Sequence, residues 1–459
     1  MLRFRGLVGL SHNAEQTRRE STPCWVPDGL AECVAVRSGI GVEDSIAVVM
    51  PEQVTSGTIS LLYVLFQYPT LSQTFVRNEV HGLRELGATV DVVSIEEGDS
   101  AHIDRGWAGD FRFLGRPGLR RATLDHIWFA VRHPRSYRRY LFAVARLREY
   151  WRLALQRLPT EARRLRSAGR PHACHTHFAW DTASPAVYLS RLLDVPASVT
   201  VHANDIYVAN APVLRTRLEH FDRVVTVCNF NVGLLNGMGV STIGAGDVDV
   251  VPCGVEVPAR STGDGAAMGT DIVSVGRLVE KKGFDSLIRA LALVRERLPD
   301  LRATIVGEGP ERDRLDSLIA ELGLQCNVIL AGANSHHATL ELIERAKVFC
   351  LASQPARNGD CDALPVVIRE AMARSVPVIS TRVAGIPETV DEEVGWLVDP
   401  RSPGQLADAI AAALGDDAER VRRGRAGRAR VMRRWTVQDQ AAGILRVFER
   451  PTGEPRSED

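Results

Sequence analysis

Two cations stand just ahead of a helix-like stretch in the C-terminal half of the chain. Arg277 and Lys282 lie in the segment VGRLVEKKG, between a strand pattern that ends at Gly276 and a helix pattern that begins soon after Gly283. The free N–H groups and the dipole of a helix N-terminus favour an anion at such a place. Arginine can hold two phosphate oxygens through its planar guanidinium, and lysine adds a compact charge. The spacing therefore indicates a phosphate site, with an exposed basic loop as the alternative for these two residues alone.

Two carboxylates lie eight positions apart in the segment DALPVVIREAMA. Asp362 and Glu370 are expected to flank the start and the middle of a short helix, near whose start Pro365 is a typical residue. At roughly 3.6 residues per turn, both side chains can lie along one side and contact two parts of one extended ligand. We expect Glu370 to accept hydrogen bonds from a ribose diol and Asp362 from the hydroxyls of a sugar. An acidic cap plus a solvent-facing glutamate is the alternative for the pair alone.

The elements that must position these residues alternate between strands and helices. The segment 59–66 is a continuous apolar run, typical of a strand buried on both faces of a parallel sheet. Further strand patterns occur at 88–95, 172–178, 197–202, 223–228 and 248–253, then at 271–276, 301–307, 327–332, 347–353 and 377–381. Helical patterns separate most of them. The sequence therefore predicts an α/β fold of two doubly wound units, with a cleft facing the carboxyl ends of their strands.

The predicted domain boundaries follow from this rhythm. Residues 1–57 show neither helical nor strand periodicity and are expected to form a weakly ordered extension. The first domain covers 58–257, a turn-rich linker covers 258–270, and the second domain covers 271–435. A helix at about 436–450 is expected to pack back on the first domain.

Composition excludes several classes of protein. The chain has 459 residues, and its 56 basic residues balance its 56 acidic ones. That balance argues against a surface coated in basic residues for nucleic acid. No apolar run approaches the roughly 18–20 residues of a membrane-spanning helix, and we identify no signal peptide. The eight cysteines form no CxxC pair, which favours reduced thiols in a cytoplasmic protein.

With these motifs in order, the chain resembles the retaining glycosyltransferases of family 4, which have the GT-B architecture of two facing Rossmann-like domains. The resemblance is carried by VGRLVEKKG, VGEGP, the carboxylate pair and PVISTRVAGIPETV in the C-terminal half. In the N-terminal half, YPTLSQTFVRNEV, HTHFAW and TVHANDIYV are similar to the exopolysaccharide branch, which includes colanic-acid-type transferases.

The resemblance implies roles for the donor-side residues. Residues matching Arg277 and Lys282 bind the donor diphosphate, the residue matching Glu370 binds ribose, and the residue matching Asp362, usually a glutamate, approaches the donor sugar. We extend this donor site to Gly276, Gly307, Glu308 and Leu364.

On the N-terminal side, the resemblance places His202 in the cleft near the donor sugar, and a structural histidine is the alternative. Asp205 is expected either to contact the acceptor or to support its loop. Ser72 and Thr74 stand where the family's Gly-Gly loop is absent, and they can cap a helix or meet phosphate and acceptor groups. Metal binding is not expected of the neighbouring segment, because strand alternation separates its side chains and the spacing matches no usual zinc pattern; the residues concerned are His172, Cys174, His175 and His177.

One segment is strongly basic. Residues 112–170 contain 16 arginines against three acidic residues, a local net charge of +13. Apolar residues from Tyr140 to Leu158 fit one helical stripe, which we expect to pack onto the first domain. The arginine excess predicts attraction to an anionic membrane surface, at about 1 kcal/mol per nearby basic residue.

We therefore expect an enzyme that moves a sugar from a nucleotide-diphosphate sugar to a glycan or a lipid-diphosphate-linked glycan, in exopolysaccharide or cell-surface glycan synthesis. No metal and no other cofactor is expected, because the basic pair can neutralise the diphosphate. A nucleotide-sugar epimerase and a catalytically silent sugar-binding or scaffolding protein of the same fold remain alternatives. An NAD-dependent oxidoreductase is disfavoured, because no GxGxxG follows the first strand.

Overall fold

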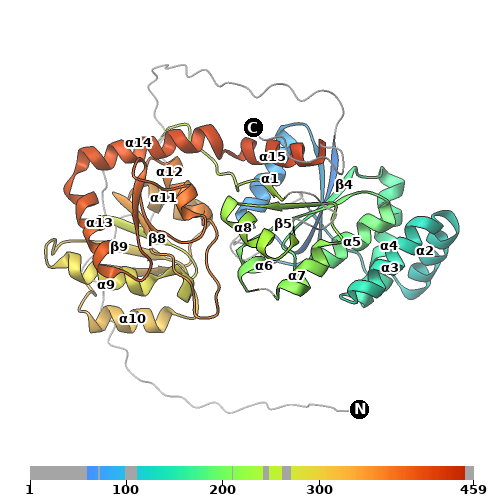
Figure 1. The fold of residues 1–459 in the computed structure, drawn as a ribbon, viewed down its shortest axis with the longest axis horizontal. Helices are drawn as coiled ribbons and strands as arrows, with labels where there is room; N and C mark the ends of the chain where they lie inside the picture. Colours follow the sequence, from blue (N-terminus) through green and yellow to red (C-terminus); the bar gives the residue numbers. More distant parts are fainter. Residues whose placement is uncertain are drawn as a thin grey trace, which may run out of the picture.

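Two parallel α/β sheets, side by side in Figure 1, form the body of the molecule. The computed structural model describes residues 59–70, 73–98, 111–208, 210–240, 248–260 and 270–449. The expected extension at 1–57, Ser72 and most of the expected linker at 258–270 lie outside these residues.

The first sheet has seven parallel strands in the order β3-β2-β1-β4-β5-β6-β7. Its central strands are buried on both faces, which explains why they read as unbroken apolar runs. The strands are β1 (Ser60–Tyr68), β2 (Thr89–Glu97), β3 (Arg112–Phe113), β4 (Ala173–His177), β5 (Ala197–Val201), β6 (Arg223–Thr226) and β7 (Asp249–Val250). The helices are α1 (Thr74–Glu85), α2 (Leu119–Arg132), α3 (Pro134–Leu147), α4 (Trp151–Ala168), α5 (Ala183–Leu193), α6 (Ala203–Tyr207), α7 (Ala211–Leu218) and α8 (Asn229–Gly237).

The second sheet has six parallel strands in the order β10-β9-β8-β11-β12-β13. Two three-residue 3₁₀ turns, Glu280–Lys282 and Ile386–Glu388, interrupt its loops. The strands are β8 (Ile272–Val275), β9 (Ala303–Val306), β10 (Val328–Gly332), β11 (Val348–Leu351), β12 (Val378–Thr381) and β13 (Gly395–Val398). The helices are α9 (Phe284–Arg295), α10 (Arg312–Glu321), α11 (His336–Glu344), α12 (Val366–Ala373), α13 (Pro403–Gly415), α14 (Asp417–Arg434) and α15 (Val437–Glu449). The expected α/β class with two doubly wound sheets is confirmed.

The chain passes between the two halves twice, and the two crossings lie together. A parallel bridge joins Val255 to Thr436, and the Val255 N–H donates to the carbonyl of Trp435 over 2.9 Å. After the second crossing, α15 packs against α1 of the first half, where a Cβ on Gly82 would come within 2.8 Å of Val437. Figure 1 shows α14 and α15 running from one half to the other.

The basic segment differs from the single stripe that the sequence predicts. It forms three helices, α2 to α4, at the end of the first half that lies farthest from the second half (Figure 1). The expected stripe is broken between α3 and α4, because Arg148 and Tyr150 adopt left-handed backbone conformations with φ of 59° and 50°. Tyr140 and Leu158 are buried as expected, whereas Trp151 is 51% exposed.

Within the described part of the chain, no helix combines the length and the apolar character needed to cross a membrane. The thiols of the following described cysteines are free and buried: Cys174, Cys228, Cys253, Cys350 and Cys361.

Candidate active site

The loop after β8 brings the two predicted cations to the carboxyl end of the second sheet. Arg277 is exposed, and no carboxylate of the described residues pairs with its guanidinium. Lys282 ends the 3₁₀ turn directly before α9, and its aliphatic chain covers Gly276, where a Cβ would lie 3.1 Å from the lysine Cε. Gly283 follows with φ of 64°, and a Cβ there would come within 1.8 Å of a carbonyl oxygen. Only glycine fits this position.

The GEGP segment after β9 lies directly against this loop. The Leu278 N–H donates to the carbonyl of Glu308 over 2.9 Å, and a Cβ on Gly307 would come within 1.9 Å of the Gly276 carbonyl oxygen. The glycines therefore serve a close approach between the two loops. The carboxylate of Glu308 is half exposed and pairs with Arg312 over 2.6 Å. In this structure Glu308 therefore forms an ion pair with the first residue of α10.

Asp362 is the anionic partner of Lys282. Its carboxylate is buried and lies 2.7 Å from the Lys282 ammonium and 3.7 Å from that of Lys281. The Ser353 hydroxyl donates to the same carboxylate over 3.0 Å. Burial acts to raise the pKa of Asp362, but the two lysines and these hydrogen bonds hold it below the usual value. Asp362 is therefore ionised at neutral pH.

The helical spacing argument for the carboxylate pair is wrong. Helix α12 begins at Val366, so Asp362 lies in the preceding loop and only Glu370 is helical. Pro365 caps the helix from outside, where its fixed φ and missing N–H cost nothing. The loop, and not a shared helix face, sets where Asp362 points.

Glu370 is a buried carboxylate with few compensating charges. Its Oε1 lies at hydrogen-bond distance, 3.0 Å, from Nε2 of His336. Burial raises its pKa to about 7, against the lowering effect of Arg374. Leu364 lies between this helix and the first half of the molecule, packed against Val227 and Cys228 among others.

His202 directly follows β5, at the carboxyl end of the first sheet. Its ring contacts those of Phe75 and Phe178, with centroid separations of 4.8 and 4.7 Å, and the two phenylalanine rings also contact each other. Nε2 of His202 is 3.1 Å from Nδ1 of His177. Burial, followed by the influence of His177, lowers the pKa of His202 well below its usual value, so the imidazole is neutral at pH 7.

Asp205 supports this loop. One carboxylate oxygen accepts the N–H of Ala179 over 3.0 Å, and the other accepts the N–H of His202 over 2.8 Å. The carboxylate is fully buried, and burial raises its pKa to about 7. Both oxygens are thus engaged by backbone groups, which favours the loop-supporting role over acceptor contact.

A small cavity opens beside His177 at the ends of β1, β4 and β5. Its volume is about 190 Å³, and Gln73, Trp180, Asp181 and Asn204 contribute polar or aromatic groups to its lining. Thr74 is the first residue of α1, and the residue at the N-cap, Gln73, makes no side-chain capping bond. Ser72 lies outside the described residues.

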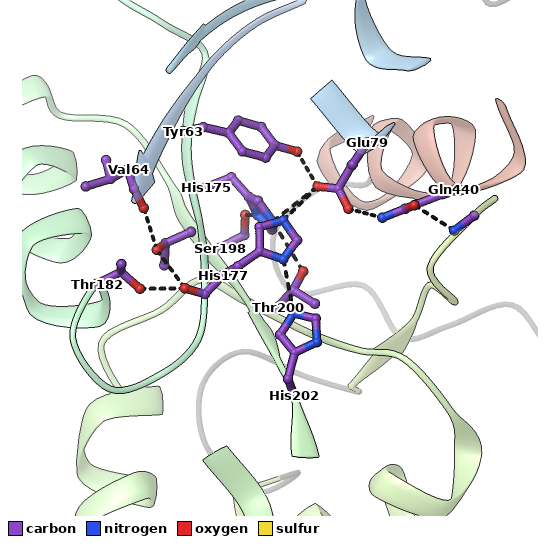
Figure 2. A network of polar contacts seen from close by, with 12 residues as sticks. Tyr63, Val64, Glu79, His175, His177, Thr182, Ser198, Thr200, His202 and Gln440 are labelled. Carbon is purple, nitrogen blue, oxygen red and sulfur yellow. Dashed lines mark hydrogen bonds and ion pairs between the residues drawn. The ribbon is translucent and has the colours of Figure 1, made fainter. Parts of the chain in front are cut away.

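The structure adds a buried cluster around Glu79 that the sequence did not single out (Figure 2). One oxygen of Glu79 accepts from Tyr63 over 2.6 Å and lies 3.1 Å from Nε2 of His177; the other accepts from Gln440 over 2.5 Å. His175 lies on the same face of β4 as His177, 3.7 Å from this carboxylate. The one hint in the sequence is the alternation of His175 and His177, since alternate residues of a strand share a face.

Among the described residues, these three side chains form the group that could hold a metal ion. The ligand atoms of Glu79, His175 and His177 lie within 4.8 Å of one another. Hydrogen bonds within the protein already engage all of them: besides the contacts of Glu79 and His177, His175 meets the hydroxyls of Ser198 over 2.6 Å and Thr200 over 3.2 Å. We therefore interpret the cluster as a hydrogen-bond network.

Glu388 is a second site residue that sequence reasoning missed. From the 3₁₀ turn of the second half, its carboxylate accepts the N–H groups of Asn229 and Phe230 over 2.9 and 2.8 Å. These groups begin α8 of the first half, so Glu388 of the second half caps a helix of the first half. Because the contact joins residues 159 positions apart, no local pattern predicts it.

Comparisons with known proteins agree with this arrangement. A family model described as "Glycosyl transferase 4-like domain" matches residues 72–254, and one described as "Glycosyl transferases group 1" matches residues 266–430. Among solved structures, HepE of Anabaena in complex with UDP superposes with a TM-score of 0.63 at 17% identity, covering 85% of this chain and 100% of its own. Fold and site thus define a glycosyltransferase of the GT-B architecture.

Sequence relatives narrow this class. WcaL of Escherichia coli, a glycosyltransferase assigned to colanic acid biosynthesis, is 26% identical over 76% of this chain and 89% of its own length. A GDP-mannose-dependent phosphatidylinositol monomannoside mannosyltransferase of Mycobacterium tuberculosis is 30% identical over 62% of this chain and 78% of its own. The chain belongs to the family 4 glycosyltransferases, in the exopolysaccharide-type branch, and transfers sugar in glycan biosynthesis.

Proposed function

We propose that this glycosyltransferase takes its sugar from a nucleotide-diphosphate donor and retains the anomeric configuration. The observation that carries the proposal is the pair of loops after β8 and β9, where Arg277, which no described carboxylate neutralises, stands beside Lys282 over a glycine-lined surface. A diphosphate could meet both cations and the N-terminus of α9 there. HepE, which shares the fold, is described in complex with UDP and with UDP-glucose, and this supports a nucleotide sugar as the ligand.

The catalytic contribution of these residues is electrostatic. Arg277 and Lys282 stabilise the diphosphate as it leaves and gains charge. Glu370 holds the ribose diol, and Asp362 meets hydroxyls of the donor sugar. We propose that the reaction needs no metal, because two cations and a helix dipole neutralise the leaving group. The acceptor hydroxyl attacks on the face from which the diphosphate departs, and a phosphate oxygen takes the proton of that hydroxyl.

The acceptor is a glycan or a lipid-linked glycan, bound from the side of the first sheet. The cavity of about 190 Å³ next to His177 has room for part of one sugar ring and is lined by Gln73, Trp180 and Asp181. Aromatic and amide side chains suit the apolar face and the hydroxyls of a sugar.

We also propose that the protein works at the inner face of the cytoplasmic membrane. Helix α2 turns Ala122, Asp125 and Phe129 inward. It exposes an apolar stripe, and exposed arginines flank that stripe on α2 and α3. The stripe consists of Leu124, Ile127 and Val131, which are 51, 54 and 71% exposed. Apolar side chains between cations suit a surface of anionic lipid headgroups.

The experiment begins with thermal-shift measurements on a panel of nucleotides, including UDP and GDP, and of the corresponding nucleotide sugars. The nucleotide sugar that raises the melting temperature most is then used as donor in a transfer assay. Arg277→Ala should reduce transfer by at least about 100-fold with an unchanged melting temperature. Arg289→Ala, which removes an exposed arginine of α9, should have no effect. NMR of the product gives its anomeric configuration.

Three results would contradict the proposal. Interconversion of the nucleotide sugar without transfer identifies an epimerase, and binding without turnover identifies a silent protein. Loss of activity in EDTA that Mg²⁺ restores overturns the metal-free mechanism.

A further inference from the structure

The cavity of about 190 Å³ beside His177 has an aromatic wall that a buried cation supports from behind. Trp180 lines the cavity, and the guanidinium carbon of Arg217 lies 4.2 Å from the centre of its ring. Arg217 does not line the cavity, so it covers the side of the indole that faces the protein. It is 9% exposed and pairs over 2.5 Å with Glu149, which neutralises its charge. The indole is therefore held in one orientation and offers its remaining surface to the cavity.

Two side-chain oxygens of the same lining are hydrogen-bond acceptors with capacity to spare. The amide oxygen of Gln73 is buried and receives no hydrogen bond from the described residues. Buried polar atoms are rarely left without a partner in folded proteins, so this oxygen is suited to a hydroxyl that donates to it. The carboxylate of Asp181 is exposed, and one of its oxygens accepts a hydrogen bond from the Tyr150 hydroxyl over 2.7 Å. Its second oxygen can accept from a ligand.

Tyr150 connects this lining to the basic helical segment. It lies at the break between α3 and α4, and its ring contacts that of Phe66 with a centroid separation of 5.8 Å. Phe66 itself lines the cavity. The break after α3 thus brings a phenol to the point where it holds the Asp181 carboxylate at the edge of the cavity.

The cavity is unsuited to a negative charge. Among the described residues that line it, none is a lysine or an arginine. Asp181 is a carboxylate, and the carboxylate of Asp205 already accepts two backbone N–H groups. The two ring nitrogens of His177 each lie 3.1 Å from a protein group, one on Glu79 and one on His202. An anionic group placed here would therefore face a like charge without a cation to pair with it, which is unfavourable.

We propose that this cavity binds the terminal sugar of the acceptor and selects a neutral sugar over an acidic one, with Trp180 as the stacking surface and Asp181 as the residue that excludes negative charge. The inference rests on the proposed function for the acceptor's being a glycan, and on the lining of the cavity for the charge of its terminal sugar. An aromatic ring packs against the C–H face of a sugar, and carboxylate and amide oxygens accept from its hydroxyls. The diphosphate of a lipid-linked acceptor lies outside a cavity of this size.

The test uses matched pairs of methyl glycosides, those of glucose, galactose and mannose and those of the corresponding uronic acids. Saturation-transfer-difference NMR measures their binding to the full-length protein, because it detects weak ligands and requires no donor. We expect at least one neutral glycoside to bind at least about tenfold more tightly than its uronate. Equal binding within every pair, or binding of none of the neutral glycosides, would overturn the inference.

Asp181→Asn separates the effect of charge from that of shape. The amide keeps an oxygen that can accept from Tyr150 and from a sugar hydroxyl, so the neutral glycoside should still bind. The uronate no longer meets a like charge, and the preference should shrink to within about threefold. An unchanged preference in the folded variant would show that Asp181 does not select against acidic sugars.

Trp180→Ala tests the stacking surface and should weaken binding of the neutral glycoside at least about tenfold. Trp180→Phe keeps an aromatic ring and should restore most of the binding. The control is Trp151→Ala, which removes a 51% exposed tryptophan of α4 that does not line the cavity. Wild-type binding by a folded Trp180→Ala, or an equal loss in Trp151→Ala, would contradict the proposal. Melting temperatures show which variants are folded, and the Asp181→Asn result decides the charge selection even if Trp180→Ala does not fold.

The inference and the proposed function can fail separately. Glycoside binding needs no donor, so it stands if the wild type transfers no sugar. Arg277→Ala should abolish transfer and leave glycoside binding unchanged. In the transfer assay, kcat/KM should be at least about tenfold higher for acceptors that end in a neutral sugar than for those that end in a uronic acid. Equal transfer to both kinds of acceptor would refute the inference and leave the proposed function intact.

Discussion

Lys282 and Arg277 are not equivalent, although the sequence presents them as a pair. Lys282 is neutralised by Asp362 at 2.7 Å, whereas Arg277 has no carboxylate partner in the described part of the chain. An arriving diphosphate would therefore meet Arg277 first. The diphosphate would also attract Lys282. This would weaken the contact between Lys282 and Asp362, so that the carboxylate of Asp362 could bind a sugar hydroxyl. An aspartate at position 362, where the family usually has a glutamate, is long enough to contact Lys282, because the lysine side chain extends toward it.

Glu370 and Asp205 both have a pKa near 7, and Glu370 is the one of the two that we expect to contact the donor. Its pKa of about 7 comes from burial, and only the ionised carboxylate can accept both hydroxyl hydrogens of a ribose. Donor binding should therefore strengthen as pH rises, by about tenfold between pH 6 and pH 8. Calorimetric titration with the preferred nucleotide sugar measures this.

The matched variant for this prediction is Glu370→Gln, which should bind more weakly and lose the pH dependence. A nucleotide sugar serves better than a free nucleoside diphosphate, because its phosphates do not change charge in this range. An equal pH dependence in Glu370→Gln would assign the titration to another group, such as Asp205, whose pKa burial also raises to about 7.

At the scale of elements, several arginines of the basic segment are paired within the fold. Asp125 is fully buried on α2 and pairs with Arg121 and with Arg163 of α4. Other arginines bind carbonyl oxygens, as Arg166 does with Leu192. The net charge of the sequence therefore overstates the free charge of this segment, and in the proposed membrane binding the exposed apolar stripe on α2 has to contribute as well.

Ile127→Ser with Val131→Ser should weaken binding to anionic vesicles by at least about tenfold, since burial of one such side chain contributes about 1.5–3 kcal/mol. Co-sedimentation with phosphatidylglycerol vesicles measures it, and binding should fall with added salt. Leu293→Ser, at a 45% exposed leucine of α9 in the other half, is the control. Binding that ignores lipid charge and salt would refute the membrane proposal.

At the scale of the whole molecule, two features control how the halves meet. The crossing is held by Arg369, which is buried, donates to the carbonyl of Cys253 over 2.8 Å and lies over the ring of Trp435 at 4.5 Å. Across the cleft, Glu388 caps α8. The first feature holds the crossing together, and the second joins the two halves directly.

Glu388→Ala should favour opening of the cleft. A lost helix cap costs about 1 kcal/mol, which shifts an open–closed equilibrium about fivefold. Small-angle X-ray scattering should show a larger radius of gyration, and donor affinity should fall by a similar factor. Glu393→Ala, which removes a carboxylate that pairs with Arg430 within the second half, should change neither. Identical scattering from both variants would show that the cap does not control closure.

The strand and helix order follows from the sequence because it depends on local patterns. Buried parallel strands read as unbroken apolar runs, so β1 and its neighbours are visible without a structure, as are the cations at the start of α9. The break between α3 and α4 cannot be predicted from the sequence. Arg148 and Tyr150 adopt left-handed conformations, and neither is a glycine, the residue that usually marks such a conformation. The placement of Asp362 outside α12 depends on where the helix begins, which spacing alone does not give.

By itself, the sequence determined the two parallel sheets, the loop that carries Arg277 and Lys282 ahead of α9, and the family. Only the tertiary structure decided what pairs with what. Glu79 and His177 are 98 positions apart, and Glu79 and Gln440 are 361 apart, yet they form one buried cluster. Local periodicity fixes which face a residue occupies, whereas contacts between distant elements depend on how the sheets and helices pack, and that information is spread over the whole chain.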